Sequence, residues 1–273
     1  MDGDAYGNWV STRFITGPLL IAFVFAVVAL TGHVVHIPWL VPLMLVGAAL
    51  AVLAAAYFAY ARHLLAANGG EVQARVQRLV LDHLDWDGGA AARAATNATA
   101  VGAGAAALDI GCGNGPLTIA LAQRFPPARV TGIDFWGGSW EYSQDVCEAN
   151  AAAQGVAGRT TFQRASAAAL PFADGAFAAV VSNLCFHEVR DASDKREVVR
   201  EALRVLEPGG AFSFQDLFRM KSVYGSIDEL VATVRGWGVA SVEYVDTARS
   251  DFIPGALRLP FMVGTMGVLH GRK

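Results

Sequence analysis

The sequence predicts a doubly wound α/β domain with a mostly parallel sheet, preceded by a transmembrane helical hairpin. From residue 105 onward, short apolar runs alternate with helical patterns, which is typical of βαβ units with helices on both faces of the sheet. Ahead of that region, no Asp, Glu, Lys or Arg occurs between Phe14 and Ala61. The alternative is a pair of buried helices in a soluble protein, but so long an uncharged stretch is hard to enclose in a chain of 273 residues.

The composition excludes several classes of protein. The net charge is −3 and the pI is about 6.1, and no basic stripe stands out, so we expect no nucleic-acid partner. The three cysteines are odd in number and lack the spacing of metal ligands. We therefore expect neither a disulfide framework nor a metal site, and a reducing compartment suits the chain.

Two apolar spans form the predicted hairpin, which occupies residues 1–62. They cover residues 14–31 and 39–60, and each approaches the roughly 20 residues that a helix needs to cross a bilayer. Gly32 and Pro38 suit a tight turn between them. A cleaved signal peptide fits less well, because the flank ahead of Arg13 is acidic and has no basic region.

Basic residues set the expected orientation. Arg13 precedes the first span, and Arg62, Arg75 and Arg78 follow the second, whereas the loop has no Lys or Arg. The positive-inside rule then places both ends in the cytoplasm. We expect an integral membrane protein with two spans and a cytoplasmic catalytic domain.

Small residues recur every four positions in the second span, at Gly47, Ala51, Ala55 and Ala59. Such a stripe lets another helix approach closely, so it is a candidate contact for a homo-oligomer. The alternative is that the stripe only reflects the abundance of alanine in this chain.

Residues 63–104 connect the hairpin to the domain at residues 105–273. Apolar residues recur at helical spacing between about Glu71 and Leu84, which predicts an amphipathic helix. Residues 87–104 are rich in Ala and Gly, and predict a linker or a surface loop.

Alternating patterns define the elements of the α/β domain. The runs that predict strands are residues 105–110, 129–133, 177–182, 211–215, about 240–245, and 261–269. The patterns that predict helices are residues 117–125, 139–154 and 194–206.

A glycine-rich turn follows the first predicted strand, in the stretch LDIGCGNGPLTIA. Glycines there let a ligand lie against the backbone, and Asp134, at the end of the next strand, is placed to bind ribose hydroxyls. The spacing is G-x-G-x-G with Pro116 where a dinucleotide fingerprint has its third glycine. This departure argues against NAD.

Several motifs, in order over about residues 105–210, resemble class I S-adenosylmethionine-dependent methyltransferases, which have a Rossmann-like fold. They are DIGCGNG at the glycine turn, VTGID in the second strand, LPFADGAFAAVVSN in the third and fourth strand region, and RVLEPGGAF before the fifth. The general type is similar to the ubiquinone and menaquinone biosynthesis methyltransferases.

The resemblance implies S-adenosyl-L-methionine as the cofactor. Asp109 and the glycines would frame its methionine end, Asp134 would hold the ribose, and Phe135 would lie beside adenine. The implied cofactor contacts are Asp109, Gly111, Gly113, Asn114, Gly115, Asp134, Phe135, Ser166, Ala167 and Asn183.

The chain also departs from the family pattern. Ser166 stands where the family often has an Asp that contacts adenine, and Ala178 replaces a frequent Asp in the fourth strand. Trp136 and Trp140, after Asp134, would line an apolar pocket or would only pack between helix and sheet.

Methyl transfer from a sulfonium needs chiefly alignment, and needs a base only for a protonated nucleophile. His187 follows the fourth strand and is the preferred base or orienting group, with Glu188 and Asp216 as weaker candidates. Tyr142 and Tyr224 offer hydroxyl groups. Cys112, inside the glycine turn, is expected to be a packing residue.

The predicted function is a membrane-anchored methyltransferase that acts on a small lipophilic or lipid-type acceptor, such as a quinone, an isoprenoid or a lipid headgroup. Two alternatives stay open. One is an S-methyltransferase for small thiols or sulfide, and the other is a non-catalytic sensor or scaffold that binds the cofactor. The sequence leaves open whether the acceptor atom is O, N, C or S.

Overall fold

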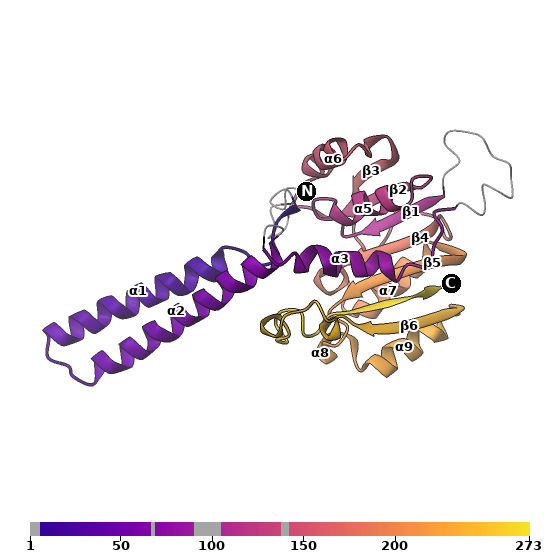
Figure 1. Ribbon diagram of the computed structural model, residues 1–273. Helices are drawn as coiled ribbons and strands as arrows, with labels where there is room; N and C mark the ends of the chain where they lie inside the picture. Colours follow the sequence, from indigo (N-terminus) through magenta and orange to yellow (C-terminus); the bar gives the residue numbers. More distant parts are fainter. Residues whose placement is uncertain (1–5, 67–68, 90–104, 138–141) are drawn as a thin grey trace. The chain divides into compact units, whose positions relative to one another are not determined.

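The computed structural model describes residues 6–66, 69–89, 105–137 and 142–273 (Figure 1). Contacts between residues divide the chain into two compact units, Met1–Ala74 and Arg75–Lys273. Most of the predicted linker at residues 87–104 lies outside the described residues. The expected division into residues 1–62, 63–104 and 105–273 stays a prediction.

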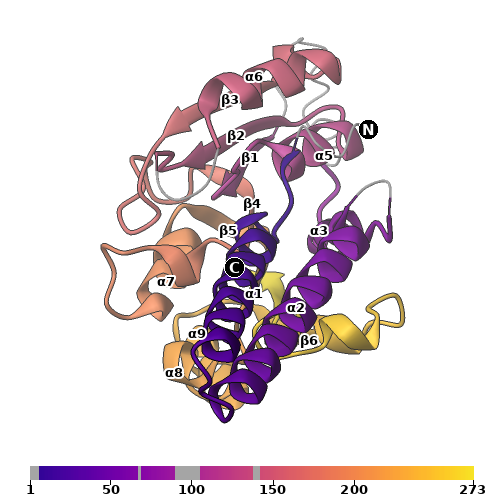
Figure 2. The same cartoon turned by 90° about the vertical axis from the view of Figure 1, so that its left-hand side faces the viewer.

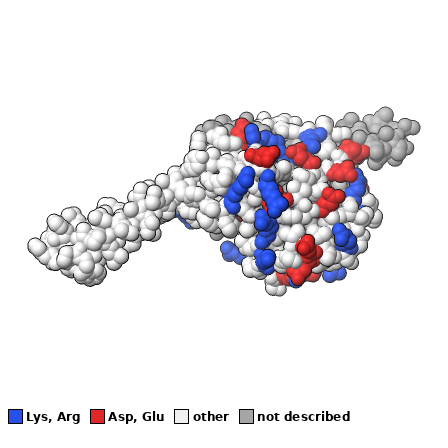
Figure 3. All heavy atoms as spheres, turned by 60° about the horizontal axis from the view of Figure 1, so that its bottom comes forward, with Lys and Arg blue, Asp and Glu red and all other residues white. Residues whose placement is uncertain are grey.

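The first unit is built on two long apolar helices, α1 (Arg13–Val34) and α2 (Leu40–Leu65), which pair as a hairpin (Figure 1). They extend the predicted spans by a few residues, and both are long and apolar enough to cross a membrane. Large side chains face outward: Leu20, Leu30 and Leu50 are each between 63% and 65% exposed. Figure 3 shows no charged side chain along the visible face of the two helices.

Close packing holds α1 and α2 together. A β-carbon at Gly47 would lie 2.8 Å from the ring of Phe25, and one at Gly32 would lie 3.1 Å from Leu40. Gly47 therefore serves a contact inside the hairpin, which is the role that small residues have between membrane helices. A contact between copies of the chain through Ala51, Ala55 and Ala59 stays a prediction.

The second unit is a seven-stranded sheet in the order β3-β2-β1-β4-β5-β7-β6. The strands are β1 (Ala106–Ile110), β2 (Arg129–Asp134), β3 (Thr160–Arg164), β4 (Phe177–Asn183), β5 (Leu206–Asp216), β6 (Ser241–Asp246) and β7 (Gly267–Arg272). Only β7 runs antiparallel to its two neighbours, so the predicted doubly wound, mostly parallel sheet is confirmed.

Helices cover both faces of this sheet, with α5 on one side and α7 on the other (Figure 2). They are α3 (Val72–Asp82), α5 (Pro116–Arg124), α6 (Gln144–Ala153), α7 (Lys195–Arg204), α8 (Lys221–Tyr224) and α9 (Ile227–Gly236). Short 3-10 turns are η2 (Ala157–Arg159), η3 (Phe186–Glu188), η4 (Thr247–Arg249) and η5 (Gly255–Leu257). An ion pair between Asp82 and Arg124 places α3 beside α5.

Three elements differ from the expectation. The third strand is β3, ahead of the LPFADGAFAAVVSN motif, because TTFQR has a single fully buried side chain, Phe162, and makes no apolar run. The last strand begins at Gly267 rather than at residue 261, since Phe261 is 65% exposed in a turn. Helix α9 lies outside the predicted helices, and a capping box of Ser226 and Glu229 starts it.

Aromatic and branched side chains fill the core between the sheet and α7. Phe186 packs edge-on against Phe214, and Phe214 stacks on Phe212, all with no exposure. Burying one such ring contributes about 1.5–3 kcal/mol. This core fixes the ends of β4 and β5, where polar side chains gather.

The sheet register aligns the ends of its strands. Asp216 of β5 pairs with Gly267 of β7, and Gly267 pairs with Asp246 of β6, so the two aspartates lie in one row. The carboxyl ends of β1, β2, β4, β5 and β6 therefore meet at one edge, where open α/β sheets bind ligands.

The Gly47–Phe25 contact predicts a specific loss of stability. Gly47→Leu overpacks the hairpin and should cost about 1–3 kcal/mol. The matched control is Gly17→Leu, because a β-carbon at Gly17 of α1 meets nothing within 4 Å. Thermal melting of the full chain in detergent, followed by circular dichroism, measures both, and equal midpoints for the two variants would contradict the packing.

Candidate active site

The turn between β1 and α5 is built from three glycines in the left-handed region, with φ of 77° at Gly111, 56° at Gly113 and 85° at Gly115. Gly115 is the N-cap of α5 and Pro116 is its first residue, where the missing N–H costs nothing. The Gly111 and Cys112 amides both donate to the Ile133 carbonyl, at 2.8 and 2.9 Å. The turn is thereby tied to the end of β2.

Two of these glycines have different neighbours. A β-carbon at Gly111 would lie 2.3 Å from Cys185, so that position must stay glycine for the turn to pack on the loop after β4. A β-carbon at Gly113 would lie 3.5 Å from the Tyr142 ring, which is an ordinary contact. At Gly113 it is therefore the left-handed φ of 56°, and not a steric clash, that favours glycine.

Asp134 bridges the glycine turn and the loop after β2. One carboxylate oxygen accepts from the Gly113 amide and the other from the Trp136 amide, both at 2.9 Å. The Trp136 indole donates to the Gly113 carbonyl at 2.8 Å, and Trp136 has a left-handed φ of 30°. The expected partner of Trp136 in a pocket wall, Trp140, lies outside the described residues.

Asn114 joins the turn to α6. Its side-chain oxygen accepts from the Ser143 amide at 3.2 Å, and its carbonyl accepts from the Asn150 amide group at 3.0 Å. The expected cofactor contact of Asn114 stays a prediction, and the structure records a positioning role.

Asp109 is fully buried at the end of β1. One oxygen accepts from the Thr118 hydroxyl at 2.6 Å, and the other, Oδ1, has no hydrogen-bond partner among the described residues. Burial raises the pKa of Asp109 to about 7; the Thr118 hydrogen bond opposes this, and the nearby charge of Asp134 adds to it.

Past β2 and β3, the edge of the sheet offers an exposed aromatic ring and an acidic group. The Phe135 ring is 59% exposed, and the Arg164 guanidinium lies 4.7 Å from its centre. Ser166 donates a hydrogen bond to Asp191 at 3.2 Å, so a carboxylate lies beside the position where the family often has one. Ala167 is buried in the core.

At the end of β4, Asn183 accepts a hydrogen bond from Gln215 at 2.6 Å, and Gln215 also donates to the Val76 carbonyl of α3 at 3.2 Å. Asn183 is thereby fixed in place, and its expected cofactor contact stays a prediction.

His187 forms a pair with Asp216, which has no solvent exposure. The His187 Nδ1 lies 2.6 Å from Asp216 Oδ1, and the His187 amide donates to the other Asp216 oxygen at 3.3 Å. The His187 Nε2 lies 3.8 Å from a carboxylate oxygen of Glu188. Burial lowers the pKa of His187, but the Asp216 hydrogen bond and the Asp216 and Glu188 charges outweigh it, so the pKa is raised.

The tyrosines differ in position. Burial, with the charges of Glu188 and Asp134, raises the pKa of Tyr142 to about 12, so its hydroxyl keeps its proton at neutral pH. Tyr224 is fully buried and packs against Phe218 in the core. Cys112 is buried as well, in agreement with a packing role.

Three residues of the site lay outside the sequence-based expectation. Thr118 and Gln215 lie within a helix and a strand as ordinary polar residues, and only the folded structure brings them to Asp109 and Asn183. Asp191 follows an irregular loop, and no motif pointed to it. Among residues 6–66, 69–89, 105–137 and 142–273, no group of three His, Cys, Asp or Glu side chains is arranged to bind a metal.

The site fits a cofactor that carries an ammonium group and a ribose. Among the described residues, Asp109 Oδ1 is a buried acceptor without a hydrogen-bond partner, Gly113 presents no side chain, and the Asp134 carboxylate stands at the end of β2. These are the groups that a nucleoside and an amino acid moiety require at such a turn.

Comparison with known proteins identifies the domain. Residues 107–210 match the family described as "Methyltransferase domain". The chain is 35% identical over 104 residues to the ubiquinone/menaquinone biosynthesis C-methyltransferase UbiE of Geotalea daltonii, covering 38% of this chain and 41% of that one. It is 39% identical over 103 residues to the demethylmenaquinone methyltransferase of Thermus thermophilus, covering 38% and 43%.

The fold matches solved methyltransferases. Geranyl diphosphate C-methyltransferase from Streptomyces coelicolor A3(2), solved with Mg²⁺, geranyl diphosphate and S-adenosyl-L-homocysteine, superposes with a TM-score of 0.53 at 15% identity. The match covers 73% of this chain and 79% of that one. The chain spans less than half the length of the two relatives matched by sequence.

The raised pKa of Asp109 predicts a pH-dependent stability. A carboxyl whose folded-state pKa is about 7 contributes stability below its ordinary pKa near 3.8, and this contribution is lost as the pH rises through 7. Asp109→Asn can still accept from Thr118 and has no charge. The free energy of unfolding of the variant, relative to that of the wild type, should therefore rise by roughly 2–4 kcal/mol from pH 4 to pH 8, at about 1.4 kcal/mol per pKa unit.

Thermal midpoints of the full chain in detergent at several pH values measure this gain. The exposed Asp251→Asn removes the same charge and should follow the wild type at every pH. A constant difference between Asp109→Asn and the wild type would mean that Asp109 is ionised in the folded protein throughout.

Proposed function

We propose that this chain, whose residues 107–210 belong to the methyltransferase domain family, methylates a lipophilic acceptor that reacts through a hydroxyl group. The observation that carries the proposal is the His187–Asp216 pair at the edge of the sheet that also carries the glycine turn. The pair supplies a base, and a base is what a hydroxyl nucleophile needs.

S-adenosyl-L-methionine would supply a methyl group activated on a sulfonium. Asp109 Oδ1 and the Gly113 backbone would bind its amino acid end, and Asp134 would accept from the ribose hydroxyls. Phe135 offers a ring face to adenine, and the Ser166–Asp191 pair offers oxygen acceptors to the adenine amino group.

His187 would act as the general base. With Nδ1–H donated to Asp216, its Nε2 keeps a lone pair that accepts the proton of the acceptor hydroxyl. The buried Asp216 carboxylate stabilises the imidazolium that forms, and Glu188 lies 3.8 Å from Nε2 to share the charge. Such a base contributes typically 10²–10⁴-fold in rate.

The need for a base favours one acceptor class. A phenol has a pKa near 10 and a thiol one near 8.5, so at neutral pH a hydroxyl depends more on proton removal than a thiol does. Removing the proton of a phenol-type hydroxyl activates its oxygen and also the ring carbon beside it. Methylation at the ring carbon is the outcome that fits the relative named as a C-methyltransferase.

An enzyme fits the site better than a sensor or scaffold does. Cofactor binding alone requires the glycine turn and Asp134. Burying a carboxylate beside a histidine costs desolvation free energy, and a catalytic role accounts for that cost. The His187–Asp216 pair is therefore a feature that a sensor would not need.

The hairpin would hold the enzyme on the membrane. Exposed leucines along α1 and α2 leave an apolar surface that water solvates poorly. A bilayer covers such a surface, and it also concentrates a lipophilic acceptor near the domain.

Replacing His187 tests the reaction. His187→Gln should lower methyl transfer from labelled cofactor to reduced demethylmenaquinone by 10²–10⁴-fold, while calorimetry shows cofactor affinity unchanged. Because the pKa of His187 is raised above 6.5, wild-type kcat/KM should fall as the pH is lowered through that raised pKa. In Asp216→Asn, the fall in kcat/KM should occur at a lower pH.

Full turnover by His187→Gln would rule out a role as base. Labelling of a membrane lipid extract is the second assay in the same experiment, and it detects acceptors other than the quinol. If the wild-type chain binds the cofactor yet labels neither substrate, the proposed activity is wrong.

Residue labelling tests the topology. With both ends in the cytoplasm, Val35→Cys lies in the loop on the far side of the membrane and should react with an impermeant maleimide in intact cells. A cysteine at Ala66, after α2, should react only after permeabilisation. The reversed pattern would overturn the orientation, and extraction of the chain by carbonate alone would overturn the spans.

A further inference from the structure

We infer that Arg219 and Arg249 form a phosphate-binding subsite for the methyl acceptor, two strands away from His187. The inference rests on the proposed function only in assigning the phosphate to the acceptor. The subsite itself is defined by a hollow, by its charges and by its place at the carboxyl edge of the sheet.

The register of the sheet places this subsite beside the reaction centre. Asp216, Gly267 and Asp246 lie in one row across β5, β7 and β6. Arg219 follows Asp216 by three residues, and Arg249 follows Asp246 by three, so both arginines lie in loops after parallel strands. Strands lie about 4.8 Å apart, which separates the two aspartate backbones by about 10 Å.

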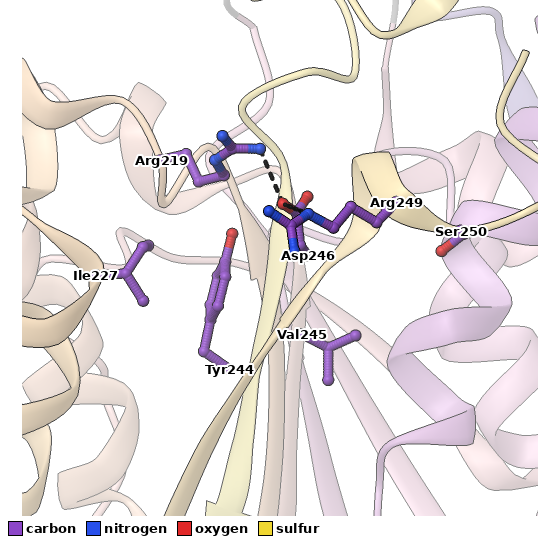
Figure 4. A pocket seen from close by; sticks show the side chains of 7 residues that line it. All are labelled: Arg219, Ile227, Tyr244, Val245, Asp246, Arg249 and Ser250. Carbon is purple, nitrogen blue, oxygen red and sulfur yellow. Dashed lines mark hydrogen bonds and ion pairs between the residues drawn. The ribbon is translucent and has the colours of Figure 1, made fainter. Parts of the chain in front are cut away.

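A hollow of about 650 Å³ lies between these loops (Figure 4). Its lining residues are Arg219, Ile227, Tyr244, Val245, Asp246, Arg249 and Ser250. In Figure 4 the two guanidinium groups converge on Asp246 from opposite sides. The volume suits a small organic group rather than a single ion.

The charges in the hollow favour an anion. Arg219 Nη1 and Arg249 Nε lie 2.8 and 3.3 Å from the same oxygen, Asp246 Oδ2. The other oxygen of Asp246 accepts from the Ala248 amide at 3.0 Å. Asp246 is the single acidic residue among those that line the hollow, so the two arginines leave a net charge of +1.

Most of the guanidinium donors stay available. The Arg249 side chain is 84% exposed and that of Arg219 is 43% exposed. A guanidinium has five N–H donors in a planar fork, and one contact to Asp246 engages few of them. Surface ion pairs of this kind contribute little to stability, so stability alone does not account for two arginines on one oxygen.

Tyr244 adds a further donor. Its hydroxyl is buried and has no hydrogen-bond partner among the described residues. It lies against Gly267, where any side chain would collide with the phenol, 2.3 Å from a β-carbon. The phenol is thus kept at the wall of the hollow by a position that only glycine can occupy.

Two guanidinium groups and a tyrosine hydroxyl match the oxygens of a phosphate group. Arginine binds phosphate bidentately, and a phosphate presents three oxygens to separate donors. We therefore assign to the acceptor a phosphate that lies two strands along the sheet edge from the hydroxyl that His187 deprotonates. The same phosphate chemistry would also fit the headgroup of an anionic lipid.

Binding of phenyl phosphate tests the subsite without any methyl transfer. Calorimetry on the full chain in phosphatidylcholine nanodiscs should show binding that weakens at least tenfold in Arg219→Gln and in Arg249→Gln. Arg235→Gln, on the exposed face of α9, removes the same charge outside the hollow and should bind as the wild type does. Equal binding by Arg249→Gln and the wild type would overturn the subsite, as would an equal loss in Arg235→Gln.

Lipid composition separates the two sources of phosphate. Adding phosphatidylglycerol to the nanodiscs should leave phenyl phosphate affinity unchanged if the acceptor carries the phosphate. Competition by phosphatidylglycerol would overturn the assignment to the acceptor and make the lipid headgroup the ligand. Cofactor affinity, measured on the same samples, should stay unchanged in all variants.

The two proposals fail separately. Tight phenyl phosphate binding by a chain without methyl transfer would refute the activity and keep the subsite. Methyl transfer by a chain that does not bind phenyl phosphate would refute the subsite and keep the activity.

Discussion

A carboxylate with no access to water must be paired or protonated, and this constraint organises the carboxyl edge of the sheet. Asp109 ends β1 and Asp216 ends β5, and both are fully buried. At Asp109, burial raises the pKa to about 7, and one carboxyl oxygen accepts from Thr118. Asp216 meets the constraint through His187. The two carboxyl groups thereby mark the β1 end and the β5 end of the candidate site.

The rest of the site follows from these two positions. The pairing with Asp216 fixes His187 Nδ1 as the donor, and this leaves Nε2 as the one nitrogen with a lone pair. Near Asp109, the left-handed glycines turn the chain away from the strand, and the Asp134 carboxylate holds that turn through the Gly113 amide. Asp109 and Asp216 lie at strand ends and Asp134 is held by two backbone amides, so the three carboxyl groups are positioned by the sheet and the glycine turn.

The sequence predicts the parts of the site that have local causes. The glycine turn, Asp134 and His187 follow apolar runs that are strong strand signals, so their place at the carboxyl edge is determined by a few neighbouring residues. Strand β3 and helix α9 have weaker patterns and were missed. Asp191 and Arg219 lie in turns and Arg249 ends the 3-10 turn η4, and only the path of each segment through space shows which residues they contact. Loops carry function without carrying a periodic pattern.

The helices of the first unit and the sheet edge of the second unit differ in how many charged side chains they carry. Helices α1 and α2 have no Asp, Glu, Lys or Arg between Phe14 and Ala61, so under the proposed function they would offer an acceptor mainly apolar contact. Apolar contact discriminates poorly between lipophilic molecules, because one methylene contributes only about 0.8 kcal/mol. Polar groups that are left unpaired by a wrong ligand discriminate far better. Under the proposed function, selection among lipophilic acceptors would therefore come from polar groups at the carboxyl edge of the sheet.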